Sequence, residues 1–265
     1  MNEVKPHLSY EKQINKLREK GCIIDDDSFC RDVLVNIGYY RLSAYFLPFK
    51  NFDGTYMDNL SFERVYRIYE FDRKLRNLLF SAIEVIEVSL RTRLAHFHSE
   101  KYGSLGYLDA SSFNSKHNTD KFKQNIDREI ENNKKVLFVK HHIDNYDGQF
   151  PLWVISELFT FGMLSYFYND LTTADKKAFA GADYKNMISW MRCCTDLRNI
   201  CAHYGRLYFR IFSAMPSGFQ ISEAAKRRLW GAILSVKALY PSAEKWNIDL
   251  YHLSFPRDWA IQLKK

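Results

Sequence analysis

Glycine, proline and cysteine are scarce in this chain, whose 265 residues include 11 Gly, 6 Pro and 5 Cys. With so few turn-forming residues and 16% aromatic content, the composition excludes a disordered segment or a turn-rich sandwich and favours helices. The cysteines are odd in number and form no CxxC pair, so neither a disulfide framework nor a zinc ribbon is indicated. The predicted fold class is all-α, in a reducing cytoplasm.

Long apolar runs without charge are also missing. The segment MNEVKPHLSYEKQ lacks the apolar core of a signal peptide, and the longest apolar stretch, WVISELFTFGMLSYFY, is interrupted by Glu157 and Gly162. We therefore expect no membrane contact. The eight histidines form no HExxH cluster, which disfavours a metal-dependent hydrolase, and neither metal nor cofactor is expected. The net charge of +7 suits a polyanionic partner but also many other basic proteins.

Apolar periodicity and capping residues predict a small helical unit at the N-terminus. Ser9 can cap a first helix that Gly21 ends, and a second helix follows Asp27 as far as Gly38. The aromatic segment GYYRLSAYFLPFK comes next. The predicted domains are an N-terminal unit over residues 1–52, a helical core over 53–240 and a tail over 241–265 packed on the core.

A long helix is predicted from Ser61 to about Phe97, because apolar residues recur there with a period near 3.6. Its polar side carries Arg73, Arg76, Glu84, Glu87 and Arg91. Glu87 and Arg91 form either a solvated i,i+4 pair or a pair turned inward near a site. Further helices are expected around Lys116 to His142, from Tyr184 to Tyr204 and from Ser222 to Leu239.

The segment PLWVISELFTFG predicts a helix that begins at Pro151 and buries Trp153. Glu157 lies there among large apolar residues, and a buried carboxylate needs a basic partner. Whether that partner is structural or belongs to a site is left open by the pattern.

On a helical wheel, the helix predicted to end at Tyr204 has one apolar and one polar face. The apolar face lies opposite Asn199. Within roughly 40° of that opposite direction are Trp190, Cys194, Leu197 and Cys201. The polar ridge, within roughly 60° of Asn199, holds Arg192, Thr195, Asp196, His203 and Arg206, with Arg198 about 100° away. Gly205 is expected to end this helix and leave His203 near solvent.

This ridge can serve RNA cleavage without a metal, which needs one group to take the 2′-hydroxyl proton, one to protonate the leaving oxygen and a cation over the phosphorane. One histidine transfers one proton at a time, so a second histidine from a symmetry mate, or a water, would be required. An Arg and a His five residues apart are, by themselves, weak evidence for such a site.

Four motifs make the evidence more specific: GYYRLSAYFLPF, IYEFDRKLRNLLFSAIEVIEVSLRTRLA, PLWVISELFTFG and LRNICAHYGRLYFR. In this order, over roughly Pro6 to Arg210, they resemble the Abi-type abortive-infection family of bacterial phage defence, the AbiD and AbiF group. That family is similar to the HEPN superfamily, whose hallmark Arg, polar residue and His correspond to Arg198, Asn199 and His203. The resemblance implies a HEPN-like helical bundle.

For function, the resemblance implies a homodimeric, metal-independent endoribonuclease that leaves a 2′,3′-cyclic phosphate, controlled by an RNA or protein antitoxin. Arg198, Asn199 and His203 would be catalytic, and Glu157, Glu84, Glu87 and Arg91 would support them. Arg192, Tyr204, Arg206 and Arg210 are the predicted RNA contacts. Many relatives have a second His and an Asn where this chain has Tyr204 and Phe209, which puts paired histidines within one chain in doubt.

Two other functions compete with this prediction. HEPN-like domains also serve as non-catalytic RNA-binding or assembly modules, in which the Arg and His bind without cutting. A DNA-binding regulator using the N-terminal helices would need base-contacting cations, but Arg18, Lys20 and Arg31 are sparse.

Overall fold

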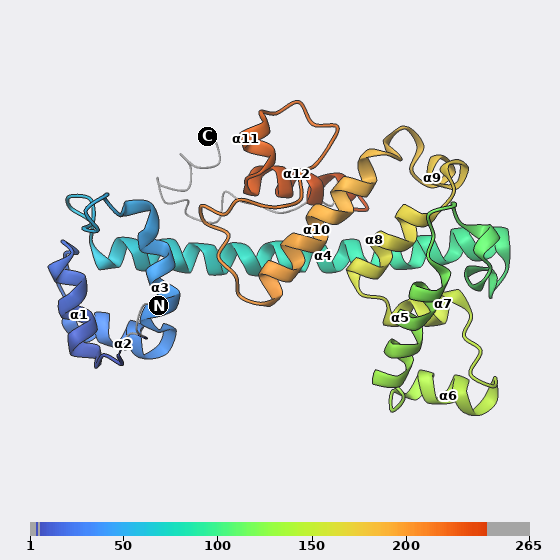
Figure 1. The fold of residues 1–265 in the computed structure, drawn as a ribbon, viewed down its shortest axis with the longest axis horizontal. Coiled ribbons are helices and arrows are strands. Elements are labelled where there is room, and N and C mark those ends of the chain that lie inside the picture. Colours follow the sequence, from blue (N-terminus) through green and yellow to red (C-terminus); the bar gives the residue numbers. More distant parts are fainter. Residues whose placement is uncertain (1–3, 5, 243–265) are drawn as a thin grey trace. The chain divides into compact units, whose positions relative to one another are not determined.

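The computed structural model describes Val4 and residues 6–242, and this part of the chain is all-α (Figure 1). Its helices are α1 (Tyr10–Glu19), α2 (Asp27–Ile37), α3 (Tyr39–Phe46), α4 (Phe62–Tyr102), α5 (Thr119–Asn132), α6 (Leu137–Asn145), α7 (Leu152–Ile155), α8 (Phe161–Asp170), α9 (Thr173–Ala180), α10 (Asn186–Ala202), α11 (Glu223–Lys226) and α12 (Leu229–Leu239). Short 3₁₀ turns join several of them. The predicted all-α class is confirmed.

Two compact units divide the described residues. The first holds residues up to 78 together with 204–211, and the second holds 79–203 together with residues from 212 onward. The long helix α4 contributes to both units, and the chain returns to the first unit directly after His203. The domain boundaries predicted at residues 52 and 240 stay predictions, and the predicted tail, apart from its first two residues, lies outside the described residues.

Local capping signals explain α1 and α2. Ser9 Oγ accepts the backbone N–H of Lys12 at 3.4 Å, and an Asp26 carboxylate oxygen accepts that of Phe29 at 3.0 Å. Gly38 ends α2 with φ 86°, a conformation that favours glycine. Both predicted helices are confirmed, with Asp26 rather than Asp27 as the cap of the second.

A buried polar cluster ties the segment after the predicted catalytic motif to the first unit. Asp72 is fully buried and accepts hydrogen bonds from Tyr45 Oη at 2.6 Å, from Arg76 Nη1 at 2.6 Å, and from the backbone N–H groups of Leu207 and Tyr208 at 3.1 Å each. Burial raises the pKa of Asp72, and these donors oppose the rise. Arg76, expected on the polar side of α4, is 3% exposed because it pairs with this carboxylate.

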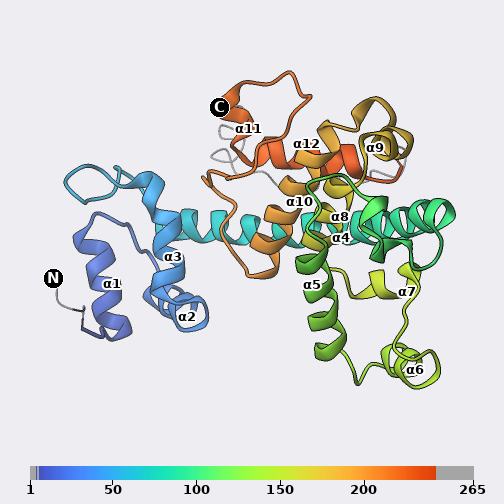
Figure 2. The ribbon, with the colours of Figure 1, turned by 45° about the vertical axis from the view of Figure 1, so that its right-hand side comes forward.

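In the second unit, α10 packs against α8 and α12, and Figures 1 and 2 show it beside α12. Its apolar face is the predicted one, and the following side chains are buried: Trp190, Cys194, Leu197 and Cys201. The amphipathic segment expected around Lys116 to His142 forms two helices, α5 and α6, while the one expected from Ser222 forms α11 and α12. Neither α8 nor α9 was predicted.

The segment after Pro151 differs from its prediction. The helix α7 has four residues and continues as a 3₁₀ turn over Ser156–Leu158, so its side chains do not keep α-helical spacing. Trp153 is 54% exposed rather than buried. The Glu157 side chain is also 54% exposed, so the expectation of a buried carboxylate is wrong.

A buried histidine makes the second unit sensitive to acid. His98 is fully buried among the rings of Tyr102, Phe113 and Phe167, and neither ring nitrogen has a hydrogen-bond partner. Burial lowers the pKa of His98 from 6.5 to about 4, with Asp175 opposing the shift. The folded state therefore holds this ring neutral at pH values where the unfolded chain is already protonated.

We expect the His98→Phe variant to lose less stability than the wild type on acidification. A depressed pKa in the folded state gives stability that is complete above pH 6.5 and is lost as pH falls toward 4. From pH 7 to pH 5, the free energy of unfolding of the wild type should fall by about 2 kcal/mol more than that of the variant. Urea unfolding at both pH values measures this, and equal pH dependence in the two proteins would contradict the assignment.

Candidate active site on helix α10

The motif helix ends two residues earlier than its pattern predicts. The last helical residue of α10 is Ala202, and His203 caps the helix, its backbone N–H donating to the Asn199 carbonyl at 3.1 Å. Tyr204, and not Gly205, adopts the left-handed conformation, with φ 56°. His203 therefore lies at a helix end, as expected, but the left-handed residue that ends the helix is Tyr204.

Three polar side chains of α10 and its cap face outward. Arg192, Asn199 and His203 are exposed, and their spacing of seven and four residues places them along one face over about 16 Å. Two more residues of the ridge, Thr195 and Asp196, are engaged within the protein. Thr195 Oγ1 donates to the Met191 carbonyl at 2.8 Å, and Asp196 accepts from the residues that follow Phe212.

Asn199 and His203 are neighbours on this face but do not orient each other. Within the described part of the chain, neither side chain makes a hydrogen bond. The imidazole is consequently free to rotate and to present either nitrogen to a ligand. The predicted amide-to-imidazole contact is not formed.

Arg198 lies on the flank of α10 and contacts α4. Its Nε is 3.8 Å from Glu87 Oε2, and its guanidinium carbon lies 5.9 Å from the centre of the Phe80 ring. The side chain is 35% exposed. Together with Glu84, these residues border a hollow of about 330 Å³. A phosphate that binds Arg198 would have to compete with the Glu87 carboxylate.

Glu87 and Arg91 form the i,i+4 ion pair, at 3.1 Å, but the pair is not solvated. Their side chains are 15% and 13% exposed. Arg91 also donates to the Phe159 carbonyl at 3.1 Å and lies 3.6 Å from Glu157, which supplies the basic partner predicted for that carboxylate. Burial raises the pKa of Glu87, and Arg91 and Arg198 oppose the rise. The predicted supporting residues Glu87, Arg91 and Glu157 thus form one connected chain of charges.

The predicted RNA contacts after His203 belong to the first unit. Arg206 is half-buried and donates to the Ala44 carbonyl, and burial lowers its pKa, so Arg206 does not extend the ridge of α10. The reason is that the helix has already ended at Ala202. Tyr204 and Arg210 are both exposed, and the Tyr204 carbonyl accepts from Arg41 Nη1 at 3.0 Å.

Sequence analysis missed an aromatic side chain next to Arg192. Tyr166 of α8 is 72% exposed and, with Arg192, borders a pocket of about 420 Å³ between α8 and α10. An exposed ring in the same pocket as a guanidinium can stack a nucleic-acid base. The sequence signal for Tyr166 was weak, because it lies on α8, a helix that was not predicted.

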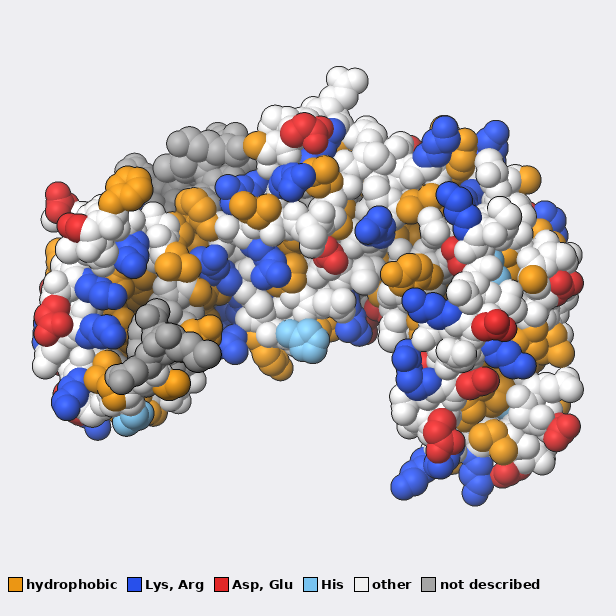
Figure 3. All heavy atoms as spheres, viewed as in Figure 1, with side chains coloured by type: hydrophobic (Ala, Val, Ile, Leu, Met, Phe, Trp, Pro, Cys, Tyr) orange, Lys and Arg blue, Asp and Glu red, His pale blue; other side chains and the backbone are white. Residues whose placement is uncertain are grey.

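The N-terminal helices offer little for DNA recognition. Arg18 forms an ion pair with Asp27, and Arg31 forms one with Glu11. Two of the three cations named for that alternative are thus engaged by carboxylates. Figure 3 shows Lys and Arg side chains spread among Asp and Glu over the visible face, so charge alone does not mark an interface.

Two further properties concern the described residues only. No three His, Cys, Asp or Glu side chains gather there as metal ligands. No helix in the same ranges combines the length and apolar character that a membrane span requires. The predicted cytoplasmic location stays a prediction.

Comparison with known proteins gives one match. The family model described as Abi-like protein matches residues 32–209, more than half of the chain and including both α4 and the motif helix. The searches of curated proteins and of solved structures gave no match. The matching family is associated with abortive infection, a form of phage defence. The chain therefore belongs to the Abi-like protein family.

Proposed function

We propose that this protein is a metal-independent endoribonuclease effector of phage defence, with His203 as its acid–base residue. The observation that carries the proposal is the exposed imidazole at the end of α10, with the exposed Asn199 one turn before it. Both belong to the RNICAH string inside the matched family region.

In this mechanism His203 takes the proton of a 2′-hydroxyl as that oxygen attacks the adjacent phosphorus. The bond from phosphorus to the 5′-oxygen then breaks, and the leaving oxygen receives a proton from a second acid. The products are a 2′,3′-cyclic phosphate and a 5′-hydroxyl. Arg198, on the flank of α10, supplies positive charge for the phosphorane, while Arg192, about 16 Å along the helix from His203, contacts another part of the RNA backbone.

The second acid comes from another copy of the chain in this proposal. Tyr204, which follows His203, has a phenol that can donate a hydrogen bond to the RNA. A homodimer that brings two α10 ends together would supply a second imidazole. Control by an RNA or protein antitoxin, and the HEPN-like character of the bundle, likewise remain proposals.

One observation favours the alternative of a non-catalytic RNA-binding or assembly module. Arg198 is held beside the Glu87 carboxylate rather than presented with His203. An arginine whose charge is already compensated contributes less to a phosphorane, although it can still support the fold of the binding face.

The test is cleavage of total bacterial RNA by the purified full-length protein in excess EDTA. The proposal expects new 3′ ends that are 2′,3′-cyclic phosphates and 5′ ends that are hydroxyls, at a rate that the chelator does not change. Cleavage that requires a divalent cation, or RNA that is bound and stays intact, would overturn it. The latter result would favour the binding module.

A further inference from the structure

One pocket of the first unit has no part in the proposed cleavage. It lies between α1, α3 and the turn that follows α3, and its volume is about 690 Å³. Pockets that hold small ligands commonly measure about 300–1,000 Å³. No residue of the RNICAH string borders this pocket.

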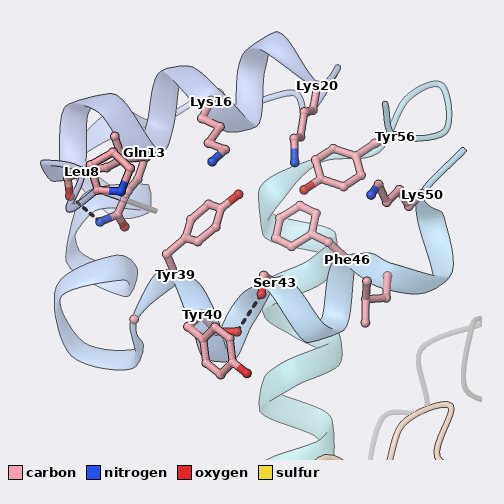
Figure 4. A pocket seen from close by; sticks show the side chains of 13 residues that line it. Leu8, Gln13, Lys16, Lys20, Tyr39, Tyr40, Ser43, Phe46, Lys50 and Tyr56 are labelled. Atoms are coloured by element: carbon pink, nitrogen blue, oxygen red, sulfur yellow. Dashed lines mark hydrogen bonds between the residues drawn. The ribbon is translucent and has the colours of Figure 1, made fainter. Parts of the chain in front are cut away.

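The charged residues of this pocket are all cations. Figure 4 shows Lys16 and Lys20 extending from α1 and Lys50 approaching from the other side, with their ammonium groups toward the pocket. No Asp or Glu borders it. The ammonium groups of Lys16 and Lys50, at a pocket that no carboxylate borders, favour an anionic ligand.

The walls of the pocket are aromatic. Tyr56 is buried, Tyr39 is half-buried, and Tyr40 at the mouth is 92% exposed (Figure 4). The Lys16 ammonium lies 5.9 Å from the centre of the Tyr39 ring, and the Lys20 ammonium lies at the same distance from that of Tyr56. These rings offer flat apolar surfaces directly below the cations.

The phenol groups add a neutral donor. Burial raises the pKa of Tyr39 and that of Tyr56, and the Tyr56 hydroxyl donates to that of Tyr39, which leaves the Tyr39 hydroxyl to donate to a ligand. A ligand for this pocket therefore combines a negative group for the lysines, a hydrogen-bond acceptor for the Tyr39 phenol and a flat ring for the aromatic surface.

We infer that the pocket between α1 and α3 binds a nucleotide, with its phosphate on Lys16 and Lys50 and its base against Tyr39 and Tyr40. Inorganic phosphate would use the cations but not the rings, and an uncharged aromatic compound would use the rings but not the cations. The nucleotide is either a free mononucleotide or one residue of a single-stranded RNA, since both present the same groups.

The test uses the full-length chain carrying His203→Ala, so that an RNA probe is not cut. Binding of AMP is measured by calorimetry, and binding of a labelled five-nucleotide RNA by fluorescence anisotropy. The Lys16→Ala/Lys50→Ala double variant and Tyr40→Ala should each weaken binding about tenfold or more. Lys12→Ala, an exposed lysine of α1 that does not border the pocket, is the matched control and should leave both affinities unchanged.

The two ligand sources separate in this design. If AMP binds and the pocket variants weaken AMP binding, the pocket holds a free nucleotide. If only the RNA binds and the same variants weaken RNA binding, the pocket holds one nucleotide of an RNA strand. Affinities that the pocket variants leave unchanged, or inorganic phosphate that competes as well as AMP, would overturn the inference. Neither result depends on whether His203 cleaves RNA.

Discussion

Replacing His203 with alanine is expected to lower the rate of RNA cleavage by about 10²- to 10⁴-fold, the range in which a positioned acid–base group usually contributes. The imidazole is exposed, and only the backbone of His203 takes part in the α10 end. Removing the ring should therefore leave the free energy of unfolding within about 0.5 kcal/mol of the wild-type value. Single-turnover cleavage of a defined RNA gives the rate, and urea unfolding gives the stability.

The matched control is His141→Ala, since His141 is an exposed histidine of α6, outside the motif helix. Asn199→Ala should have an intermediate effect, because the amide has no hydrogen bond to the ring and acts only on a bound substrate. Equal rates for the His203→Ala and His141→Ala variants would remove His203 from the mechanism. A stable His203→Ala protein that still binds RNA but no longer cuts it would separate catalysis from binding.

Features set by short-range signals were predicted well from the sequence. The start of α1 follows from Ser9 and the end of α2 from Gly38, whose side chain or backbone freedom acts within one helical turn, and the start of α2 was misplaced by one residue. The buried face of α10 follows from its own periodicity, because Trp190 and Cys194 repeat every turn or so toward α8 and α12. Predicting these features required only nearby residues and the assumption that the protein has an apolar core.

The two missed helices show where periodicity fails. The helices α8 and α9 lie in a stretch of mixed aromatic and polar residues, and α8 is apolar on most sides because it is largely buried. Their caps were nevertheless present, since Thr160 and Thr172 each accept a backbone N–H three residues later. Capping residues were thus the more informative signal here.

Burial of charge could not be predicted from one helix alone. Glu87 and Arg91 have the spacing of a solvated pair, yet Phe159 and Glu157 from another segment cover Arg91. In the same way, the end of α10 was assigned to Gly205 by residue preference, whereas Tyr204 takes the left-handed conformation. At Arg91 the deciding contacts come from residues far apart in the sequence.

Asp72 is the clearest case of such a long-range contact. It was not singled out in the sequence, although Asp72 and Arg76 have i,i+4 spacing on the long helix. Its role depends on two residues more than a hundred positions later, Leu207 and Tyr208. Their backbone N–H groups donate hydrogen bonds to the Asp72 carboxylate. Since these residues follow His203 by only a few positions, Asp72 fixes the course of the chain just after the proposed catalytic histidine.

We expect Asp72→Ala to lower the free energy of unfolding by about 3–5 kcal/mol, because it leaves the buried Arg76 guanidinium and two backbone N–H groups without their acceptor. Glu70→Ala, on the same helix, should cost about 1 kcal/mol or less, since the partly exposed Glu70 side chain pairs only with Arg73 at the surface. Urea unfolding compares the two. Asp72→Asn keeps the size of the side chain and one acceptor oxygen, so its loss should fall between them. If Asp72→Ala and Glu70→Ala cost the same, the buried carboxylate does not anchor residues 204–211, and the position of the chain after His203 must be set by other contacts.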